Sequence, residues 1–565
     1  MSNVDIQNAI PTDFILRRPT STSKSILRKN LMEVLPVEQT SFIPGQNQII
    51  RFQVASNSDI LSGPESYCRF DFTQTVDNHD NLAALDVGGI NSLFRVIEIR
   101  ALGSGILLQR YDQYHRWNAI QSLLKDSPED IECKGQSSGD SMGIGEYNAG
   151  REESRVLSGV GFAIDTSGIV TASGGLALRE LAVGDMVTIS GRAQAYNTAA
   201  GGSEVADIFA AQEYTGTVTA IASNTAFTLS PPPVTPMTAS GAGAARVYKK
   251  KSIQAARSRA CSGETMTLTF KPRLSLLTHN IPLFLMKGGI EISFELDSAH
   301  RSLQLISNAN LSVGNQGVSP AYEITRPRFM AMMVTPHSDI VDEYVKEWRS
   351  PTGLVYSIPS VRYRRGPGVA GEQNTSLHVN PGVRSARRMY MAIQESSLAE
   401  AASTSVVGNL YAGISTFLRD LVTSFQVKIG SHEYPNRAVA CDADSYEMKE
   451  QLKQVCGNYG AMRLQPQDWA SADDGALGLS TAHAATITAV NHDAKHFIFG
   501  VDLSRDDGPN GELTGADLSV VPMDVELERS AARDSTNYAG RPIYHIFIEH
   551  DSFLKISSEQ TSVIN

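Results

Sequence analysis

The 565-residue sequence lacks the features that place a chain in a membrane or outside the cell. Its longest uninterrupted apolar block is about six residues, far short of the roughly 18 that a membrane-spanning helix needs. The opening residues, MSNVDIQNAIPTDF, lack a basic segment followed by an apolar one, so no signal peptide is expected. The five cysteines are scattered, odd in number and without a CxxC pair, which favours free thiols in a reducing compartment.

An excess of positive charge is also missing. The formal net charge is -11 and the pI about 5.6, whereas a nucleic-acid-binding domain is usually basic, so any contact with nucleic acid must be local. With 45 glycines and 24 prolines the composition is that of a turn-rich, β-leaning globular chain. The length exceeds one ordinary hydrophobic core and predicts two or more domains.

Motifs of catalysis and cofactor binding are missing as well. There is no GxxxxGK[ST], no GxGxxG opening a helix and no HExxH. GDSMG (139–143) matches GxSxG, but its polar flanks favour a loop over a hydrolase nucleophile at Ser141. DLSRDDGPNGE (502–512) has the wrong register for an EF-hand, which favours a solvated turn over a calcium site. We therefore assign no catalytic, cofactor-binding or metal-binding residue, and we expect no enzyme and no cofactor.

The sequence does contain many strand-like segments. In HNIPLFLMKGGIEISFELD (279–297), an apolar block at 281–286 and a Gly-Gly turn precede strict alternation of apolar and polar residues. We expect the block to be a buried connection and the alternating part to be a strand with its apolar side chains toward the core. PMDVELERS (522–530) repeats this alternation late in the chain. The predicted inward residues are Ile290, Ile292, Phe294 and Leu296 in the first strand, and Met523, Val525 and Leu527 in the second.

Three segments show helical spacing instead. Apolar residues predict a helix near 114–124, a second over 338–349 with Ser338 as its N-cap, and a third after the cap candidate Ser445. The order of strands, helix and late amphipathic strand occurs once before the 338–349 helix and again after it. Eight antiparallel strands with long crossing loops suit a jelly roll. The predicted fold is all-β, with two tandem eight-stranded jelly rolls.

The first of these rolls contains a stretch of different composition. Residues 127–260 are rich in Gly, Ala, Ser and Thr, and VGDMVTISG (183–191) and YTGTVTAIASNTAFTLSPPP (214–233) predict short strands of a small barrel or sandwich. We therefore expect a β-rich insertion domain at 155–247. The predicted organisation is an N-terminal arm (1–45), a first jelly roll (46–337) interrupted by this insertion, a linker helix (338–352) and a second jelly roll (353–565).

The predicted arm is polar, irregular and locally basic. Five cations and two acids give residues 1–32 a net charge of +3. Either this is a solvated tail, or it contacts neighbouring subunits or an anionic inner surface. The candidate inner-face or inter-subunit contacts are Arg17, Arg18, Lys24, Arg28 and Lys29. Further basic groups near residues 249–251, 362–365 and 384–388 lack interleaved aromatic residues, so we expect subunit contacts there rather than single-strand binding.

Two pairs of segments carry a family resemblance. FRVIEIRALGSGILLQRYDQYHRWNAIQSLL (94–124), followed by PRLSLLTHNIPLFLMKGGIEISFELD (272–297), resembles the first half of a double jelly-roll major capsid protein. FIFGVDLSRDDGPNGELTGADLS (497–519) with PMDVELE (522–528) resembles the second half. The family is that of polinton-like viruses and virophages, within the lineage of adenovirus and tectivirus capsids. The resemblance covers roughly residues 45–130 and 260–560 and leaves the insertion outside.

The resemblance implies a structural protein of the virion, made in the host cytoplasm. Such proteins form homotrimers whose six jelly rolls make a pseudo-hexagonal capsomer of an icosahedral shell around a DNA genome. The implied partners are further copies of the chain, a penton protein, and minor capsid or cement proteins. The resemblance also implies a weak inner contact of the arm with genome or membrane, and an insertion on the outer tower.

Two other classes stay open on the sequence alone. One is a viral spike or β-rich attachment or carbohydrate-binding protein, and the other is an enzyme whose site carries no known motif. The repeated order of elements and the linker helix favour the capsid protein over both.

Overall fold

A computed structural model describes the chain in segments that belong to two compact units. Unit 1 comprises residues 1–143, 258–474 and 479–565, and unit 2 comprises residues 144–257 with 475–478. The described residues are 26–46, 48–76, 81–127, 137–140, 155–164, 167, 169–173, 186–191, 212–223, 226–230, 237–239, 245–249, 265–307, 320–368, 372–395, 414–415, 417–418, 422–441, 447–457, 462–464, 496–506, 513–529, 541–558 and 561–564.

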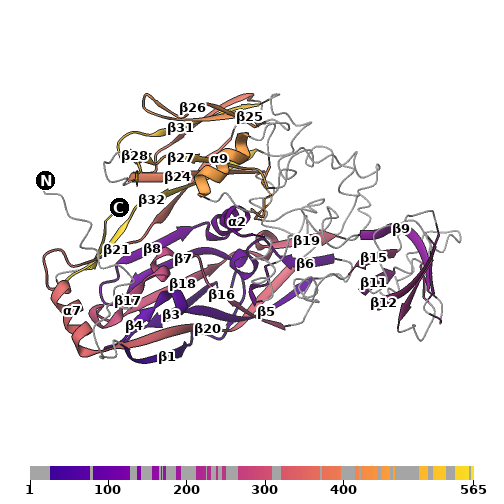
Figure 1. Cartoon of the computed structure of the whole chain (residues 1–565), viewed down its shortest axis with the longest axis horizontal. Coiled ribbons are helices and arrows are strands. Elements are labelled where there is room, and N and C mark those ends of the chain that lie inside the picture. The colour runs from indigo at the N-terminus through magenta and orange to yellow at the C-terminus, as the bar shows by residue number, and fades with distance from the viewer. Residues whose placement is uncertain are drawn as a thin grey trace. The chain divides into compact units, whose positions relative to one another are not determined.

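The first half of unit 1 is a sandwich of two antiparallel sheets (Figure 1). One sheet has, in spatial order, β1 (Ile26–Val34) with β2 (Ser41–Phe42), then β20 (Pro320–Pro336), β5 (Tyr67–Val76) and β16 (Thr265–Phe270). It is extended beside β20 by β4 (Ile60–Ser62) and β17 (Asn280–Pro282). The facing sheet has β3 (Ile49–Val54), β18 (Ile290–Leu296), β7 (Phe94–Ala101) and β8 (Leu107–Asp112).

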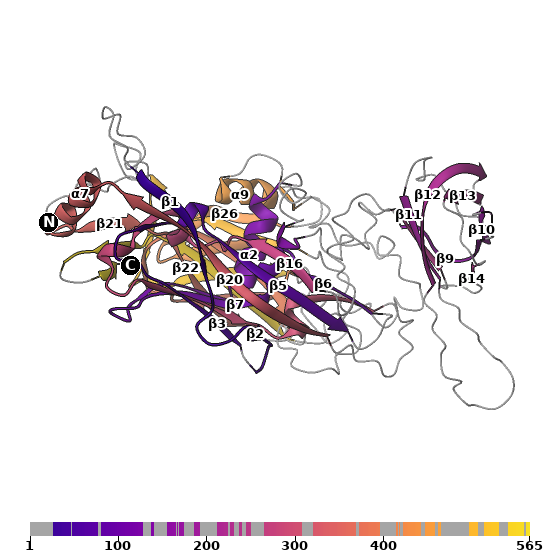
Figure 2. The ribbon, with the colours of Figure 1, turned by 90° about the horizontal axis from the view of Figure 1, so that it is seen from below.

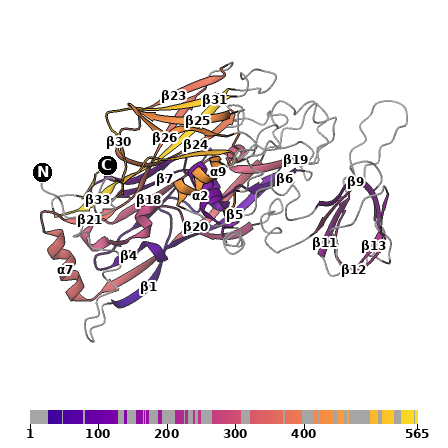
Figure 3. The ribbon, with the colours of Figure 1, turned by 45° about the horizontal axis from the view of Figure 1, so that its top comes forward.

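The second half repeats this construction. One sheet has β22 (Ser360–Pro367), β32 (Pro542–His550), β24 (Val383–Glu395) and β27 (Ile498–Asp502) in spatial order. The other has β23 (Asn374–Val379), β31 (Met523–Arg529), β25 (Val422–Ile429) and β26 (His432–Ala440). In Figure 3 this second sheet is the outer layer of its half, above β24.

Both halves have the strand order of a jelly roll. The eight main strands of each half can be numbered one to eight in the order in which they occur along the chain. In both halves, the spatial order of the strands in one sheet is then first, eighth, third, sixth, and in the other sheet second, seventh, fourth, fifth. A helix follows the fifth strand each time: α2 (Tyr114–Lys125) in the first roll and α9 (Glu447–Cys456) in the second. A third helix, α7 (Ser338–Trp348), links the rolls. The predicted double jelly roll is confirmed.

Shorter elements complete unit 1. They are the single-turn helices η2 (Gly63–Glu65), η3 (Gly89–Leu93), η4 (Ser275–Thr278), η5 (Leu283–Leu285) and α6 (Ala299–Ser302), and the strands β6 (Asn81–Leu85), β19 (Leu303–Ser307), β21 (Leu354–Ser357), β28 (Arg505–Asp506), β29 (Leu513–Thr514), β30 (Ala516–Leu518), β33 (Phe553–Ile556) and β34 (Thr561–Ile564).

Strict alternation places the predicted faces as expected. All four apolar residues of β18 are buried while the residues between them are half-buried, and β31 buries Met523, Val525 and Leu527 in the same way. In the first roll the two sheets meet through aromatic rings. The ring centroid of Phe70 on β5 lies 6.1 Å from that of Phe52 and 6.0 Å from that of Phe294, both in the facing sheet. Each fully buried side chain of this size contributes about 1.5–3 kcal/mol.

The turn before β18 depends on glycine. Gly288 and Gly289 have φ values of +81° and +79°, a region that residues with a Cβ rarely adopt. A Cβ on Gly289 would also lie 2.1 Å from the carbonyl oxygen of Val54. The apolar block before this turn forms β17 and η5, with Ile281 and Leu283 buried, as predicted for a buried connection.

The cap of α7 differs from the prediction by one residue. His337 is the N-cap, and its Nδ1 accepts a hydrogen bond from the backbone N–H of Asp339 at 3.4 Å. Ser338 is the first helical residue. An imidazole nitrogen can satisfy an exposed N–H at a helix start as a hydroxyl does, so composition alone does not separate the two positions. The cap candidate Ser445 of α9 lies outside the described residues.

Unit 2 is a small antiparallel barrel. Its strands are β9 (Arg155–Ile164), β10 (Ile169–Ser173), β11 (Met186–Gly191), β12 (Gln212–Ser223), β13 (Ala226–Ser230), β14 (Met237–Ala239) and β15 (Ala245–Lys249). Because β10 pairs with both β13 and β9, six strands close into a ring, and β14 adds to β9. Figure 2 shows these strands curving around one another. The strands lie within or next to residues 155–247.

Candidate functional site: the junction of the rolls and the exposed edge strand

Helix α2 joins the two rolls through an aromatic contact. Trp117 is only 4% exposed, and its ring centroid lies 5.5 Å from that of Tyr390 on β24 and 5.7 Å from that of Phe547 on β32. Both partners belong to the second roll, whereas α2 follows β8 of the first. The buried apolar residues of the two rolls form one continuous cluster. The rolls therefore share a core at this junction.

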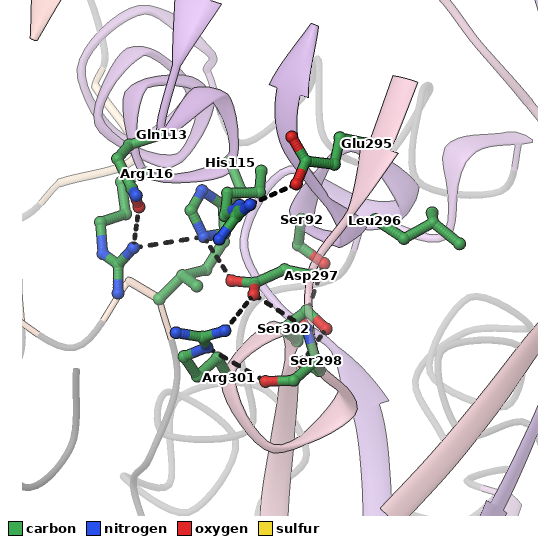
Figure 4. Close-up of polar contacts among 12 residues, drawn as sticks. Ser92, Gln113, His115, Arg116, Glu295, Leu296, Asp297, Ser298, Arg301 and Ser302 are labelled. Carbon is green, nitrogen blue, oxygen red and sulfur yellow. Dashed lines mark hydrogen bonds and ion pairs between the residues drawn. The ribbon is translucent and has the colours of Figure 1, made fainter. Parts of the chain in front are cut away.

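A buried polar cluster lies beside α2 (Figure 4). Asp297, directly after β18, is contacted by His115 Nε2 at 2.9 Å, by an Arg301 amino group at 2.7 Å and by the backbone N–H of Ser298 at 2.8 Å. These hydrogen bonds and positive charges hold the pKa of Asp297 far below its ordinary value, although burial alone would raise it. The carboxylate thus stays ionised and ties α2 to the end of β18.

Polar contacts also cross from one roll to the other. Arg116 Nε donates to the Gln394 side-chain oxygen at 2.9 Å, and the backbone N–H of Ser415 donates to Asp86 at 3.0 Å. The backbone N–H of Leu464 donates to the Leu123 carbonyl at 3.0 Å. Buried hydrogen bonds of this kind are costly to break singly, because the abandoned partner stays desolvated. They fix the orientation of one roll on the other.

The cluster is closed to substrate. His115 is 0% and Asp297 2% exposed, so a molecule in solvent cannot reach the pair. Burial lowers the pKa of His115, and burial together with Arg116, His115 and Arg365 lowers the pKa of His545 further. Both imidazoles are therefore neutral near pH 7. No group of three or more His, Cys, Asp or Glu that could hold a metal ion occurs among the described residues.

A cleft of about 1010 Å³ lies beside α2 and is lined by residues of both rolls. Lys125 and Arg273 from the first roll and Arg388 and Glu549 from the second line it. Glu549 lies 3.5 Å from Arg388 and 4.0 Å from Lys125, and burial lowers the pKa of Lys125. The lining therefore contains carboxylates as well as cations.

Two of the five predicted contact residues lie on the exposed strand β1. Arg17, Arg18 and Lys24 fall outside the described residues. Arg28 and Lys29 are exposed on β1, and Lys29 makes an ion pair with Glu65. In Figures 1 and 3, β1 lies at the outer margin of the first roll, next to β20. The two described candidates, Arg28 and Lys29, are therefore neighbours on one strand, and no site that includes the other three is described.

β1 lies in the segment 1–45, for which the sequence predicts an irregular arm and no strand. The strand pairings of β1 are all with β20, from Ile26 opposite Pro336 to Val34 opposite Phe329. Large apolar side chains on and just after this strand are exposed: Leu27 (62%), Leu31 (40%), Leu35 (62%) and Val37 (52%). The leucines at every fourth position of this polar segment were the available signal. That spacing puts them on one face of a strand and equally on one face of a helix, so it did not identify a strand.

The other basic groups differ in their surroundings. Arg387 lies 2.8 Å from Asp551, and Arg364 donates to the carbonyl of Asn380 at 3.1 Å. Arg362 and Arg384 are exposed. The side chains of residues 249–251 are outside the described part of the chain.

Comparison with known proteins gives structural matches only. No protein-family model and no curated protein matches the sequence. The chain is similar to a chain in the cryo-EM structure of the Sputnik virophage (12% identity, 97% of this chain and 90% of that chain, TM-score 0.49) and to the Faustovirus major capsid protein (10%, 96% and 92%, 0.49). It is also similar to the mavirus major capsid protein (9%, 97% and 92%, 0.42). At such identities and TM-scores the likeness carries no functional assignment.

Proposed function

We propose that this chain is the major capsid protein of a virus, a homotrimeric pseudo-hexagonal tile of an icosahedral shell that encloses a DNA genome. The observation that supports this function is the duplication of one strand order within unit 1. Two rolls with the same topology and the same helix after the fifth strand share one core. One chain therefore presents two lobes of similar construction in a fixed relation.

Threefold symmetry would turn the two rolls of each chain into six similar lobes. Homo-oligomers favour closed rotational symmetry, and three copies around a threefold axis would display six similar rolls. Six rolls approximate a hexagon, which tiles a surface with neighbours on every side. The buried junction at Trp117 and Arg116 suits this role, because a tile whose lobes rotate freely would not hold a lattice angle.

The proposed partners follow from this geometry. Hexagonal tiles alone do not close a shell, so a penton protein at the vertices is proposed, with minor capsid or cement proteins between tiles. Obligate subunit interfaces usually bury more than ~2,000 Å². The basic residues of the N-terminal segment are proposed to contact neighbouring subunits, or weakly the genome or an inner membrane. Across the described residues, the helices are too short or too polar to cross a bilayer.

Light scattering after size exclusion tests the oligomer. The expected mass is three times 61.1 kDa, unchanged on dilution, because a tile must be stable before it joins a lattice. A chain that stays monomeric at every concentration would contradict the tile and favour an attachment or binding protein.

A further inference from the structure

The outer edge of the first roll ends in a strand with one unused side. β1 pairs with β20 in regular register from Arg28 to Val34, with a register shift between Ile26 and Arg28, and no strand of the described chain pairs with its other edge. An exposed edge of nine residues offers unpaired N–H and C=O groups to another strand. Such edges recruit partners by strand addition when their side chains match.

The side chains of β1 divide into two faces. Met32 and Val34 lie opposite Ala331 and Phe329 of β20, which are fully buried, so these two residues face the core, while Arg28 and Asn30 of the same face are exposed. The outer face has Lys29, Leu31 and Glu33, with Leu27 next to them at the register shift and Leu35 directly after the strand. Leu27 and Leu35 are each 62% exposed.

This outer face is self-complementary when read against its own reverse. With Leu31 as the centre of an antiparallel pair, Leu31 faces Leu31, Lys29 faces Glu33, and Leu27 faces Leu35. Directly opposed residues of an antiparallel pair share a face and interact, so apolar meets apolar and cation meets anion at the outer positions of the regular part of the strand, from Lys29 to Glu33. We propose that β1 pairs with β1 of a second copy across a twofold axis at Leu31, joining two sheets edge to edge.

Other registers lose this match. Centring the pair on Lys29 or on Glu33 opposes two like charges at the axis, which destabilises a strand pair. Centring it on Asn30 or Met32 opposes both charged residues, Lys29 and Glu33, to leucines. Among registers that keep the outer faces together, the one centred on Leu31 alone pairs opposite charges on both sides of the axis.

The intramolecular ion pairs of β1 do not block this contact. Lys29 contacts Glu65, and Glu33 contacts Arg328 at 2.8 Å, while the Lys29 and Glu33 side chains remain 46% and 42% exposed. Both partners lie on the same sheet as β1 or beside it. They hold the two charged groups near the strand, and a second copy would add a further opposite charge to each.

The occupant is therefore a second copy rather than an unrelated strand, because the matching pattern is symmetric about one residue. The inference deepens the proposed function and rests on it in one respect: the second copy is taken to belong to a neighbouring capsomer. In this arrangement Lys29, one of the predicted contact residues, lies at a contact between capsomers.

Cross-linking tests the axis directly. In the paired state the two Cα atoms of residue 31 would be about 4.5–5.5 Å apart, within the range of a disulfide. Leu31→Cys should give covalent dimers on a non-reducing gel under mild oxidation. Val520→Cys, at an 84% exposed position outside β1, is the matched control and should not, nor should the unaltered chain. Equal cross-linking of the two variants would overturn the β1 contact.

A charge exchange tests the register. Lys29→Glu and Glu33→Lys should each weaken association of capsomers about tenfold, since each opposes like charges twice across the axis. The double variant should restore it, although neither intramolecular ion pair is restored. Sedimentation velocity measures the fraction heavier than the capsomer, after light scattering has verified each variant's capsomer mass. A double variant no better than the singles would refute the register.

The two proposals fail in different ways. If the unaltered chain never forms a trimer, the proposed function is contradicted. Dimers cross-linked through Leu31→Cys would in that case still support pairing of β1 with β1. A stable trimer without that cross-link contradicts the β1 contact alone.

Discussion

Replacing Trp117 with alanine should weaken the joint between the rolls more than any single surface change. The indole is 4% exposed and packs against Tyr390 and Phe547 of the opposite roll. Because α2 belongs to the first roll, this side chain is part of both cores. The substitution removes the aromatic contact and leaves a cavity at the junction.

The magnitude follows from burial. A tryptophan buries about 150–250 Å², which at about 25 cal/mol per Å² amounts to about 4–6 kcal/mol. Measured losses for large aromatic residues replaced by alanine are about 3–5 kcal/mol, since neighbours relax partly into the cavity. We expect Trp117→Ala to lower the free energy of unfolding by about 3–5 kcal/mol.

Urea unfolding followed by far-UV circular dichroism measures this loss. Phe294→Ala is the matched control, because Phe294 is fully buried within the first roll and contacts only rings of that roll. Limited proteolysis in the linker between α7 and β21 then separates the two variants. At equal loss of stability, Trp117→Ala should be cut faster there, since its rolls separate more readily.

Two results would refute this reasoning. One is a loss below about 1 kcal/mol for Trp117→Ala, which would mean that the site collapses without cost. The other is linker cleavage of Trp117→Ala no faster than that of Phe294→Ala, which would mean that Trp117 does not couple the rolls.

Three further predictions follow from the same structure. Because burial lowers the pKa of His115 and His545, the unfolded chain binds more protons below about pH 6.5, so stability should fall from about pH 7.5 to pH 5. His545→Gln should remove part of that fall in stability. A urea midpoint of the unaltered chain that stays the same from pH 7.5 to pH 5 would contradict the prediction. Gly289→Ala should lower the free energy of unfolding, measured by urea titration, by about 1–3 kcal/mol. Gly105→Ala, also at positive φ but in open space, should cost less, and equal losses would exclude the backbone clash. Deleting 155–247 should leave the trimer intact, because these residues form a separate unit, and a lost trimer would show that the insertion supplies trimer contacts.

Local patterns were sufficient for elements with one buried face. In β18 and β31, period-two alternation fixes which side chains enter the core, and the structure buries those residues. In α2 the residues that predicted the helix, Tyr114, Trp117, Ile120 and Leu124, are buried as well, but so is every other residue from 114 to 124, which the helical spacing did not indicate. The repeat of such elements along the chain was enough to predict two jelly rolls.

Pairings between distant segments could not be read from the sequence. His115 and Asp297 are 182 positions apart, and no spacing rule connects them. Alternation tells which face of a strand is buried but not which strand lies beside it. β1 escaped prediction for a related reason: most of its side chains are exposed, so it is a strand only because β20 offers it an edge.

Electron microscopy of the purified protein tests the central claim most directly. The proposed tile predicts threefold particles with six lobes of similar size, arranged as a hexagon. Isolated two-lobed particles, with no threefold assembly at any concentration, would contradict it.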